Sequence, residues 1–171
     1  MYYTAIALAF SLFSSAVFGQ SYSVILSSLK PIALPPPGYI SLYFIVQKID
    51  ENGSGLQIYV PRHPNKWTLK IGEEMKNQLI WRGSLGNNQS QELLIELFDH
   101  DSIGKQADNL VGSFKITLDD SANKLVAKWS RPNICTPSIS IGGKEQTIRT
   151  ETCSGPSRYQ LAFKLITAAS R

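Results

Sequence analysis

The stretch Glu92–Leu118, ELLIELFDHDSIGKQADNLVGSFKITL, carries the clearest fold signal in the chain. It begins with an apolar run, passes through a loop rich in Asp and Gly, and ends where apolar and polar residues alternate. Phe114, Ile116 and Leu118 occupy every second position, which is the period of a β-strand with one buried face. We therefore expect two strands joined by a polar loop.

Outward from this stretch, the sequence continues as short apolar segments separated by Gly and Pro turns. The segments with strand character are Ser21–Leu29, Tyr39–Lys48, Leu56–Val60, Lys66–Ile71, Gln78–Trp81, Glu92–Phe98, Ser113–Leu118 and Tyr159–Ile166. Many short strands at close spacing, without a long amphipathic helix, predict an all-β sandwich or barrel in a single domain.

Three segments lead to narrower expectations. Tyr39–Lys48 is so apolar that we expect a strand buried on both faces. Pro31–Gly38 should be neither helix nor central strand, because its prolines lack a backbone donor. Ser121–Trp129 is the best helix candidate and would be short.

The first residues predict export. Ala5–Phe18 carries no charge, and Val17-Phe18-Gly19 fits a small-residue cleavage site before Gln20. The run is shorter than the ~20 residues that a membrane anchor needs. We interpret Met1–Gly19 as a signal peptide, although no Lys or Arg precedes its apolar core, and residues 20–171 as one secreted, extracellular domain. A buried core helix is the alternative.

The two cysteines, Cys135 and Cys153, fit an oxidising compartment, in which a lone pair usually forms a disulfide. A buried pair of thiols is the alternative. Asn52 and Asn88 each begin an Asn-x-Ser sequon in a polar stretch, which predicts N-glycosylation on exposed loops.

The charge balance restricts the partners. The chain has 17 Lys and Arg against 13 Asp and Glu, a net charge of +4. Such a charge favours anionic surfaces such as lipid headgroups or acidic glycans, but a nucleic-acid partner is not expected.

The Glu92–Leu118 stretch resembles the third calcium-binding loop of C2 domains. In that family a strand leads into Asp-x-Asp, a short polar loop, a further Asp, two apolar residues and Gly. Here Asp99 and Asp101 supply the first pair, Asp108 the further carboxylate, and Leu110–Gly112 the exit. The resemblance implies an antiparallel C2-like β-sandwich, with Ser23–Leu29 as its early strand.

Calcium is the cofactor that this resemblance implies. Ca²⁺ takes six to eight oxygen ligands, and the candidates are Asp99, Asp101, Asp108 and Asn109. The pattern departs from calcium-binding members of the family in two ways. The first loop, KPIALPPPG, has no acidic residue, and Asn109 stands where an Asp is usual. A site with so few carboxylates should be weak, and many C2-like folds bind no calcium.

The loop tips carry the candidate docking residues. In membrane-docking C2 domains, apolar tips insert between headgroups beside basic residues, and the corresponding residues here are Ile32, Leu34, Ile103 and Lys105. The alternative is that Ile32 and Leu34 fold back to cap the sandwich.

A second candidate surface is basic and lies in the middle strands, interleaved with Trp67 and Trp81. Its members are Arg62, Lys66, Lys70, Lys76 and Arg82. The alternative is an ordinary solvated face with both tryptophans in the core.

No pattern predicts catalysis. A nucleophile elbow, HExxH and a phosphate-binding glycine loop are all missing from the sequence, and His63 and His100 lack the spacing of metal ligands. We expect a secreted, non-enzymatic binding module that docks on a membrane lipid surface or an extracellular protein through its loop edge. The alternative is a structural subunit of an extracellular assembly, which self-associates and needs no calcium.

Overall fold

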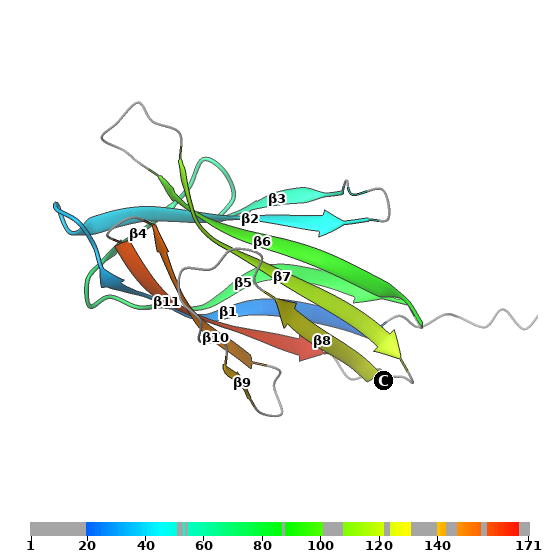
Figure 1. Ribbon diagram of the computed structural model, residues 1–171. Helices are drawn as coiled ribbons and strands as arrows, with labels where there is room; N and C mark the ends of the chain where they lie inside the picture. Colours follow the sequence, from blue (N-terminus) through cyan, green and yellow to red (C-terminus); the bar gives the residue numbers. More distant parts are fainter. Residues whose placement is uncertain are drawn as a thin grey trace, which may run out of the picture.

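The computed structural model describes residues 20–50, 53, 55–86, 88–100, 108–121, 124–130, 140–142, 147–154 and 157–167. All regular structure in these residues is β-strand (Figure 1). The strands are β1 (Gln20–Ala33), β2 (Tyr39–Ile49), β3 (Gln57–Val60), β4 (Trp67–Lys70), β5 (Met75–Leu85), β6 (Ser90–His100), β7 (Asn109–Ser121), β8 (Lys124–Ser130), β9 (Ser140–Gly142), β10 (Thr147–Ser154) and β11 (Ser157–Thr167). Within the described part of the chain, no helix could span a membrane.

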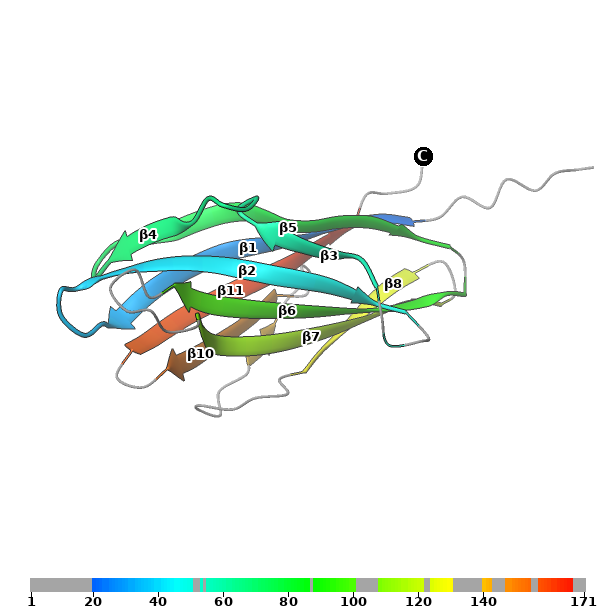
Figure 2. The ribbon, with the colours of Figure 1, turned by 90° about the horizontal axis from the view of Figure 1, so that it is seen from above.

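The strands form two sheets that lie one above the other (Figures 1 and 2). The first sheet has the order β5-β1-β11-β10-β9, and the second has the order β3-β2-β6-β7-β8, with β4 also paired to β2. Every pairing is antiparallel. The all-β antiparallel fold that the sequence predicts is therefore confirmed.

The core lies between the sheets and follows from alternation along each strand. In β6, Leu93, Ile95 and Leu97 are fully buried, whereas the residues between them are half-exposed. Phe163 of the first sheet joins the two layers: its ring lies 5.3 Å from that of Phe114 and 6.1 Å from that of Phe44, between ring centroids. Such aromatic contacts add to the burial of apolar surface that stabilises the sandwich.

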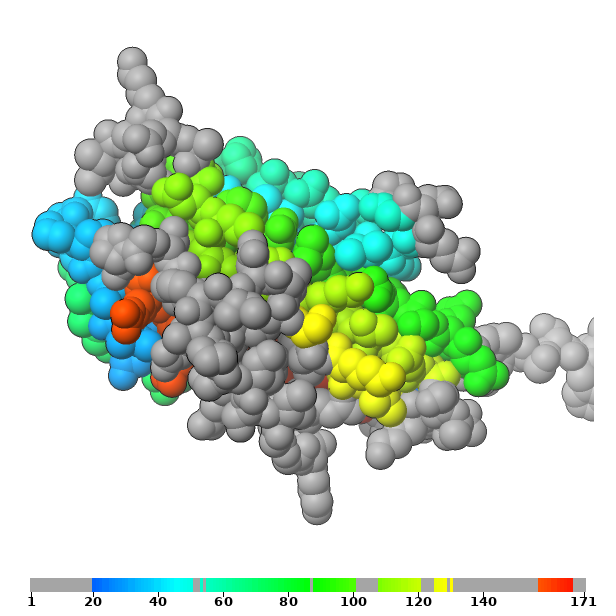
Figure 3. Space-filling view, in the orientation of Figure 1, coloured from blue at the N-terminus to red at the C-terminus, as the bar shows by residue number. Residues whose placement is uncertain are grey.

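One end of the sandwich carries the connections that matter for the site, and we call it the loop end. It consists of residues 34–38 between β1 and β2, residues 71–74 between β4 and β5, and Asp108 just before β7. Figure 3 shows the end of β1, in blue, beside the start of β11, in red-orange, at this end. The pairing of Ala33 with Arg158 accounts for that arrangement.

The predicted end of the first strand at Leu29 is wrong, whereas Pro31–Gly38 is, as expected, not part of a central strand. β1 runs on to Ala33, and Pro31 pairs with Tyr159 of β11. Pairing with β5 ends at Leu29, so β1 has a partner on one side only beyond that residue. Proline is tolerated where a strand has a neighbour on one side only, because fewer ladder hydrogen bonds need its N–H.

Two further expectations fail. The segment offered as a short helix contains β8 instead, where Leu125 is buried and pairs with Asp120 of β7. β2 is buried on one face rather than both, since its residues alternate between buried and half-exposed. The apolar residues on its outward side are instead covered partly by their neighbours on the same sheet.

β10, a polar segment, is a strand that the sequence did not suggest.

Candidate functional site

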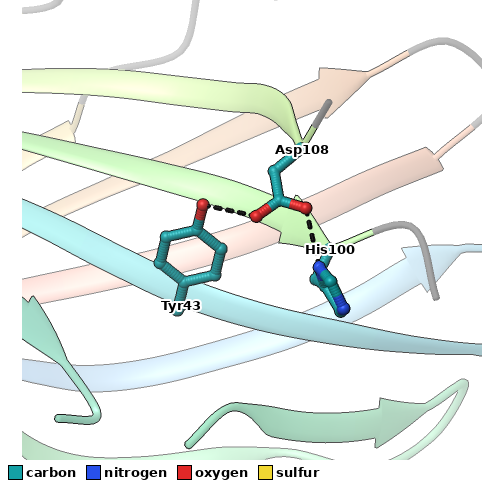
Figure 4. A network of polar contacts seen from close by, with 3 residues as sticks. All are labelled: Tyr43, His100 and Asp108. Carbon is teal, nitrogen blue, oxygen red and sulfur yellow. Dashed lines mark hydrogen bonds and ion pairs between the residues drawn. The ribbon is translucent and has the colours of Figure 1, made fainter. Parts of the chain in front are cut away.

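The most organised polar cluster on the molecule surrounds Asp108 (Figure 4). The Tyr43 hydroxyl donates a hydrogen bond of 2.7 Å to Oδ2 of Asp108. On the other oxygen, Nδ1 of His100 lies 2.7 Å from Oδ1 of Asp108. A carboxylate only accepts, so the imidazole donates from Nδ1 in this pair. Asp108 is thus fixed from two sides, by side chains that come from β2 and β6.

Strand alternation brings these three side chains to one surface. Tyr43 pairs with Phe98 across β2 and β6, and both point away from the core that Phe44 and Leu97 fill. His100 lies two residues beyond Phe98 and therefore projects to the same outward side. Asp108 reaches this side from the residue just before β7.

The charges around Asp108 reinforce the hydrogen bonds. Burial would raise the pKa of Asp108, but the hydrogen bonds from Tyr43 and His100, with the charges of His100 and Lys66, lower it below its usual value. Burial, then the hydrogen bond to Asp108 and its charge, raise the pKa of Tyr43 well above its ordinary value. The phenol therefore stays protonated and donates, and the carboxylate stays ionised and accepts.

An aromatic row continues from this cluster. The ring of Tyr43 stacks on Phe98 at 5.4 Å and on Tyr59 at 6.0 Å, between ring centroids, and Tyr59 meets His63 edge-on at 5.7 Å. The Lys66 ammonium lies 6.0 Å from the centroid of the Tyr43 ring. A hollow of about 200 Å³ opens between these groups. Its lining consists of Tyr43, Tyr59, His63, Asn65, Lys66 and Asp108.

Of the predicted calcium ligands that the structure describes, Asp99 and Asn109 are paired across β6 and β7, and Asp108 directly precedes Asn109. Asp99 follows the inward-facing Leu97 at alternate spacing and pairs with the buried Leu42. Its charge contributes to the raised pKa of the fully buried Tyr159, whose largest cause is burial. Asp99 and Asp108 thus point to opposite sides of the second sheet.

The remaining ligand candidates add little to a metal site. Asn109 is exposed at the start of β7, and Asp101 lies outside the described residues. Within the residues that the structure describes, no three His, Cys, Asp or Glu side chains are placed to hold a metal ion. Because Asp101 lies outside the described residues, calcium binding stays a prediction.

The predicted docking residues also differ in where the structure places them. Ile32 is 45% exposed near the end of β1, whereas Leu34 packs against the core, as its alternative interpretation proposed. Ile103 and Lys105 lie outside the described residues. Of the two predicted docking residues that the structure describes, Ile32 is the one on the surface, and its docking role stays a prediction.

The residues predicted for processing fall mostly outside the described part. Met1–Gly19, Asn52 and Cys135 are not described, and neither is the side chain of Cys153 in β10, so export and the disulfide stay predictions. Asn88 lies exposed in a turn, and its glycosylation stays a prediction.

The basic set expected on one shared surface is divided between the two sheets. Lys66 lies over Tyr43 on the second sheet, whereas Arg82 is on the outward side of β5 in the first. Trp81 is buried, and its Nε1 donates a 3.3 Å hydrogen bond to the Tyr22 hydroxyl. Trp67 packs edge-on against Phe44. Both tryptophans thus belong with the core.

A different basic surface emerges on the first sheet, and we call it the basic face. The neighbouring strands β5, β1 and β11 contain no Asp or Glu at all. Their cations are Lys30, Lys76, Arg82, Arg158 and Lys164. Pairing of Arg82 with Ser23, and of Lys164 with Ile25, places these cations in adjacent rows. Between them lie two exposed apolar side chains, Leu79 (44%) and Ile166 (47%).

Sequence reasoning missed both surfaces. It found Asp108 but not its partners, because Tyr43 is 65 residues away in the chain and contacts Asp108 only once β2 and β6 are paired. His63 and His100 were given no role. The signal for the basic face was present in the sequence as three apolar segments without acids, but their adjacency depends on the strand order.

No protein-family model and no curated protein matches the chain. Among solved structures it is similar to human GIVD cytosolic phospholipase A2 in complex with methyl gamma-linolenyl fluorophosphonate, with 12% identity and a TM-score of 0.43, covering 90% of this chain and 18% of that chain. It is also similar to a C2 domain of plant extended synaptotagmin 1, with 12% identity and a TM-score of 0.42, covering 90% of this chain and 96% of that chain. The second of these structures belongs to the family that Glu92–Leu118 resembles. Likeness at this level assigns no ligand, site or activity.

Proposed function

We propose that the chain is a secreted, non-enzymatic binding module that docks on an anionic membrane surface through the basic face. The observation that carries the proposal is the absence of any acidic residue from β5, β1 and β11, which together carry five cations. The net charge of the chain is +4, so these three strands, with five cations and no acid, carry more positive charge than the chain as a whole.

The energetics of such a face suit a lipid surface. A basic residue near an anionic bilayer contributes about 1 kcal/mol. Leu79 and Ile166 lie among the cations and can bury apolar surface at the headgroup boundary. The Glu74 carboxylate, just before β5, forms an ion pair with Lys76 at 3.0 Å and accepts a 2.6 Å hydrogen bond from Ser28 of β1, so it offsets part of the positive charge of this face. Within the described residues, Arg82 and Lys164 form no ion pair.

The proposal does not include calcium. Asp99 and Asp108 lie on opposite sides of the second sheet, and the basic face is on the other sheet. Docking should therefore be the same in a chelator and in millimolar calcium.

The test is co-sedimentation of the full chain with vesicles of phosphatidylcholine alone or mixed with phosphatidylserine. Only the mixed vesicles should bind, and raising the salt should weaken binding through screening. Arg82→Gln combined with Lys164→Gln should weaken binding about thirtyfold, the equivalent of about 2 kcal/mol for two cations. Lys48→Gln combined with Lys128→Gln, two exposed cations of the second sheet, is the charge-matched control and should leave binding unchanged.

Three outcomes would contradict the proposal. One is equal binding to both vesicle types, and another is equal weakening by the two variant pairs. The third is binding to heparin, a soluble sulfated glycan, without binding to the anionic vesicles, which would move the ligand from lipid to glycan.

A further inference from the structure

The hollow beside Asp108 lies on the outward side of the second sheet, away from the basic face. Its walls come from β2, β3 and the segment between β3 and β4, with Asp108 at one side. A molecule docked through the first sheet would therefore leave this hollow open to solvent.

The hollow has an exposed aromatic wall. Tyr59 is 42% exposed, and its ring is held between Tyr43, stacked at 6.0 Å, and His63, edge-on at 5.7 Å. A ring fixed by its neighbours loses little freedom on binding. Aromatic faces carry partial negative charge and attract the weakly positive C–H groups of a ligand.

The polar groups of the hollow include both donors and an acceptor. Asp108 uses each carboxylate oxygen once, toward Tyr43 and His100, and a carboxylate has about four acceptor positions. Lys66 supplies an ammonium with three donors, and the Asn65 amide can donate and accept. Because Asp108 is already fixed, it needs no reordering to accept from a ligand.

This combination restricts the ligand by charge. An anion such as phosphate would meet the Asp108 carboxylate, and a cation would meet the Lys66 ammonium. A neutral ligand that carries hydroxyl groups can donate to Asp108 and accept from Lys66 at the same time. A sugar ring has such hydroxyls at its edge and C–H groups on its faces, so it also suits the ring of Tyr59.

The geometry points to a binding site for one neutral sugar ring, lying against Tyr59 and hydrogen-bonded to Asp108 and Lys66. The volume of about 200 Å³ is below the ~300–1,000 Å³ of sites for drug-sized ligands, and it suits a single ring. For so small a ligand on an open surface, the dissociation constant should be about 1 mM.

The test is saturation-transfer NMR on the full chain with methyl glucoside, methyl mannoside and methyl galactoside, each titrated to 50 mM (roughly 50 times the expected constant). At least one should bind, and it should bind more tightly than glucuronic acid or glucosamine, its charged counterparts. Tyr59→Ala and Asp108→Asn should each weaken binding at least tenfold, and Tyr59→Phe should retain it.

Tyr39→Ala is the matched control. Tyr39 is also 42% exposed and lies on β2, but it does not line the hollow, so sugar binding should be unchanged. Circular dichroism of each variant separates a local loss from unfolding, and Tyr59→Ala removes only an exposed side chain. The inference is overturned by no binding of any neutral sugar, by tighter binding of the charged sugars, or by equal effects of Tyr39→Ala and Tyr59→Ala. Arg82→Gln with Lys164→Gln should bind sugar normally, so either proposal can fail without the other.

Discussion

The two outward surfaces of this sandwich differ in their charged residues and in the partners of those residues. On the first sheet, β5, β1 and β11 gather cations and have no acid among them. On the second sheet, Asp108 is surrounded by donors from Tyr43 and His100, with Lys66 nearby. We propose that the first surface attracts an anionic partner, whereas the Asp108 carboxylate on the second already has donors from this chain.

The difference shows that the outward residues of a β-sandwich can vary while the inward residues fill the core. Both sheets use the same alternation to fill one core, so their inward residues are interchangeable in kind: Phe44 and Phe114 from one sheet meet Phe163 from the other. The outward residues are not fixed by that packing. Attraction at long range and recognition at short range can therefore be assigned to separate faces of one small domain.

The largest expected effect comes from breaking the core that both faces share. Phe163→Ala should lower the free energy of unfolding by about 3–5 kcal/mol, because Phe163 is fully buried and joins the two sheets. Vesicle and sugar binding should be lost together. Phe98→Ala, on the half-exposed side of β6, is the control and should cost about 1–2 kcal/mol. Urea unfolding measures the loss of unfolding free energy in both variants. Equal losses would show that Phe163 contributes no more to the shared core than the outward-facing Phe98.

The next effect should disturb the first sheet alone. Gly83 pairs with Tyr22, and a Cβ at Gly83 would lie 2.7 Å from the Tyr22 hydroxyl and 3.0 Å from Nε1 of Trp81. Gly83→Ala should therefore cost about 1–3 kcal/mol through overpacking. Because Arg82 is the neighbouring residue, vesicle binding should weaken while the hollow beside Asp108 is unchanged.

A second glycine provides the control for that change. At Gly86, a Cβ would meet only the end of the Gln89 side chain, which is exposed and can move. Gly86→Ala should stay within about 0.5 kcal/mol of the wild type in thermal unfolding. Indistinguishable melting of the two variants would show that Gly83 is not needed for close packing.

The sequence predicted the alternation of the strands but not the relations between them. Phe114, Ile116 and Leu118 are buried as their spacing predicted, because alternation is local. The candidate basic surface of the middle strands is not a single surface, since Lys66 and Arg82 lie on different sheets. Sheet membership depends on pairing between segments far apart in the chain. The end of the first strand was misplaced for the same reason: whether a proline interrupts a strand depends on where the neighbouring strand ends.

The candidate site was predicted in part. Asp108 was identified by its place in the Glu92–Leu118 pattern, but the pattern implied an ion rather than a hydrogen-bonded carboxylate. The partners of Asp108 depend on strand position, because Asp99 follows the inward side of β6 and His100 the outward side. Whether an ion binds stays a prediction. The loop residues Asp101, Ile103 and Lys105 stay predictions, as does the pairing of Cys135 with Cys153.

A smaller effect tests the second surface alone. Tyr43→Phe removes the donor to Oδ2 of Asp108 and should cost about 1 kcal/mol, near the low end for a bond to a charged group because the site is partly exposed. The pKa of Asp108, followed by NMR, should rise, since this hydrogen bond helps to lower it. Tyr59→Phe is the control, because no hydrogen bond of its hydroxyl occurs within the described residues. An unchanged pKa of Asp108 in Tyr43→Phe would show that the hydrogen bond from Tyr43 does not lower that pKa.

The smallest effect concerns acid. The pKa of Asp108 is lower in the folded chain than its ordinary value of 3.8, so the ionised carboxylate stabilises the fold above about pH 4. That contribution is lost as the pH falls below 3.8 and through the folded-state pKa, because the protonated group accepts less well from Tyr43 and His100. The Asp108 side chain is 28% exposed, so the contribution should be no more than about 1 kcal/mol.

Asp108→Asn should accordingly be less stable than the wild type at pH 6, and the gap between their free energies of unfolding should narrow toward pH 2. Asp119→Asn, whose carboxylate has only a 4.0 Å contact with the exposed Lys128, is the control and should show a smaller gap. Urea unfolding across this range measures the gap, and one that stays constant with pH would show that Asp108 contributes through its shape rather than its charge.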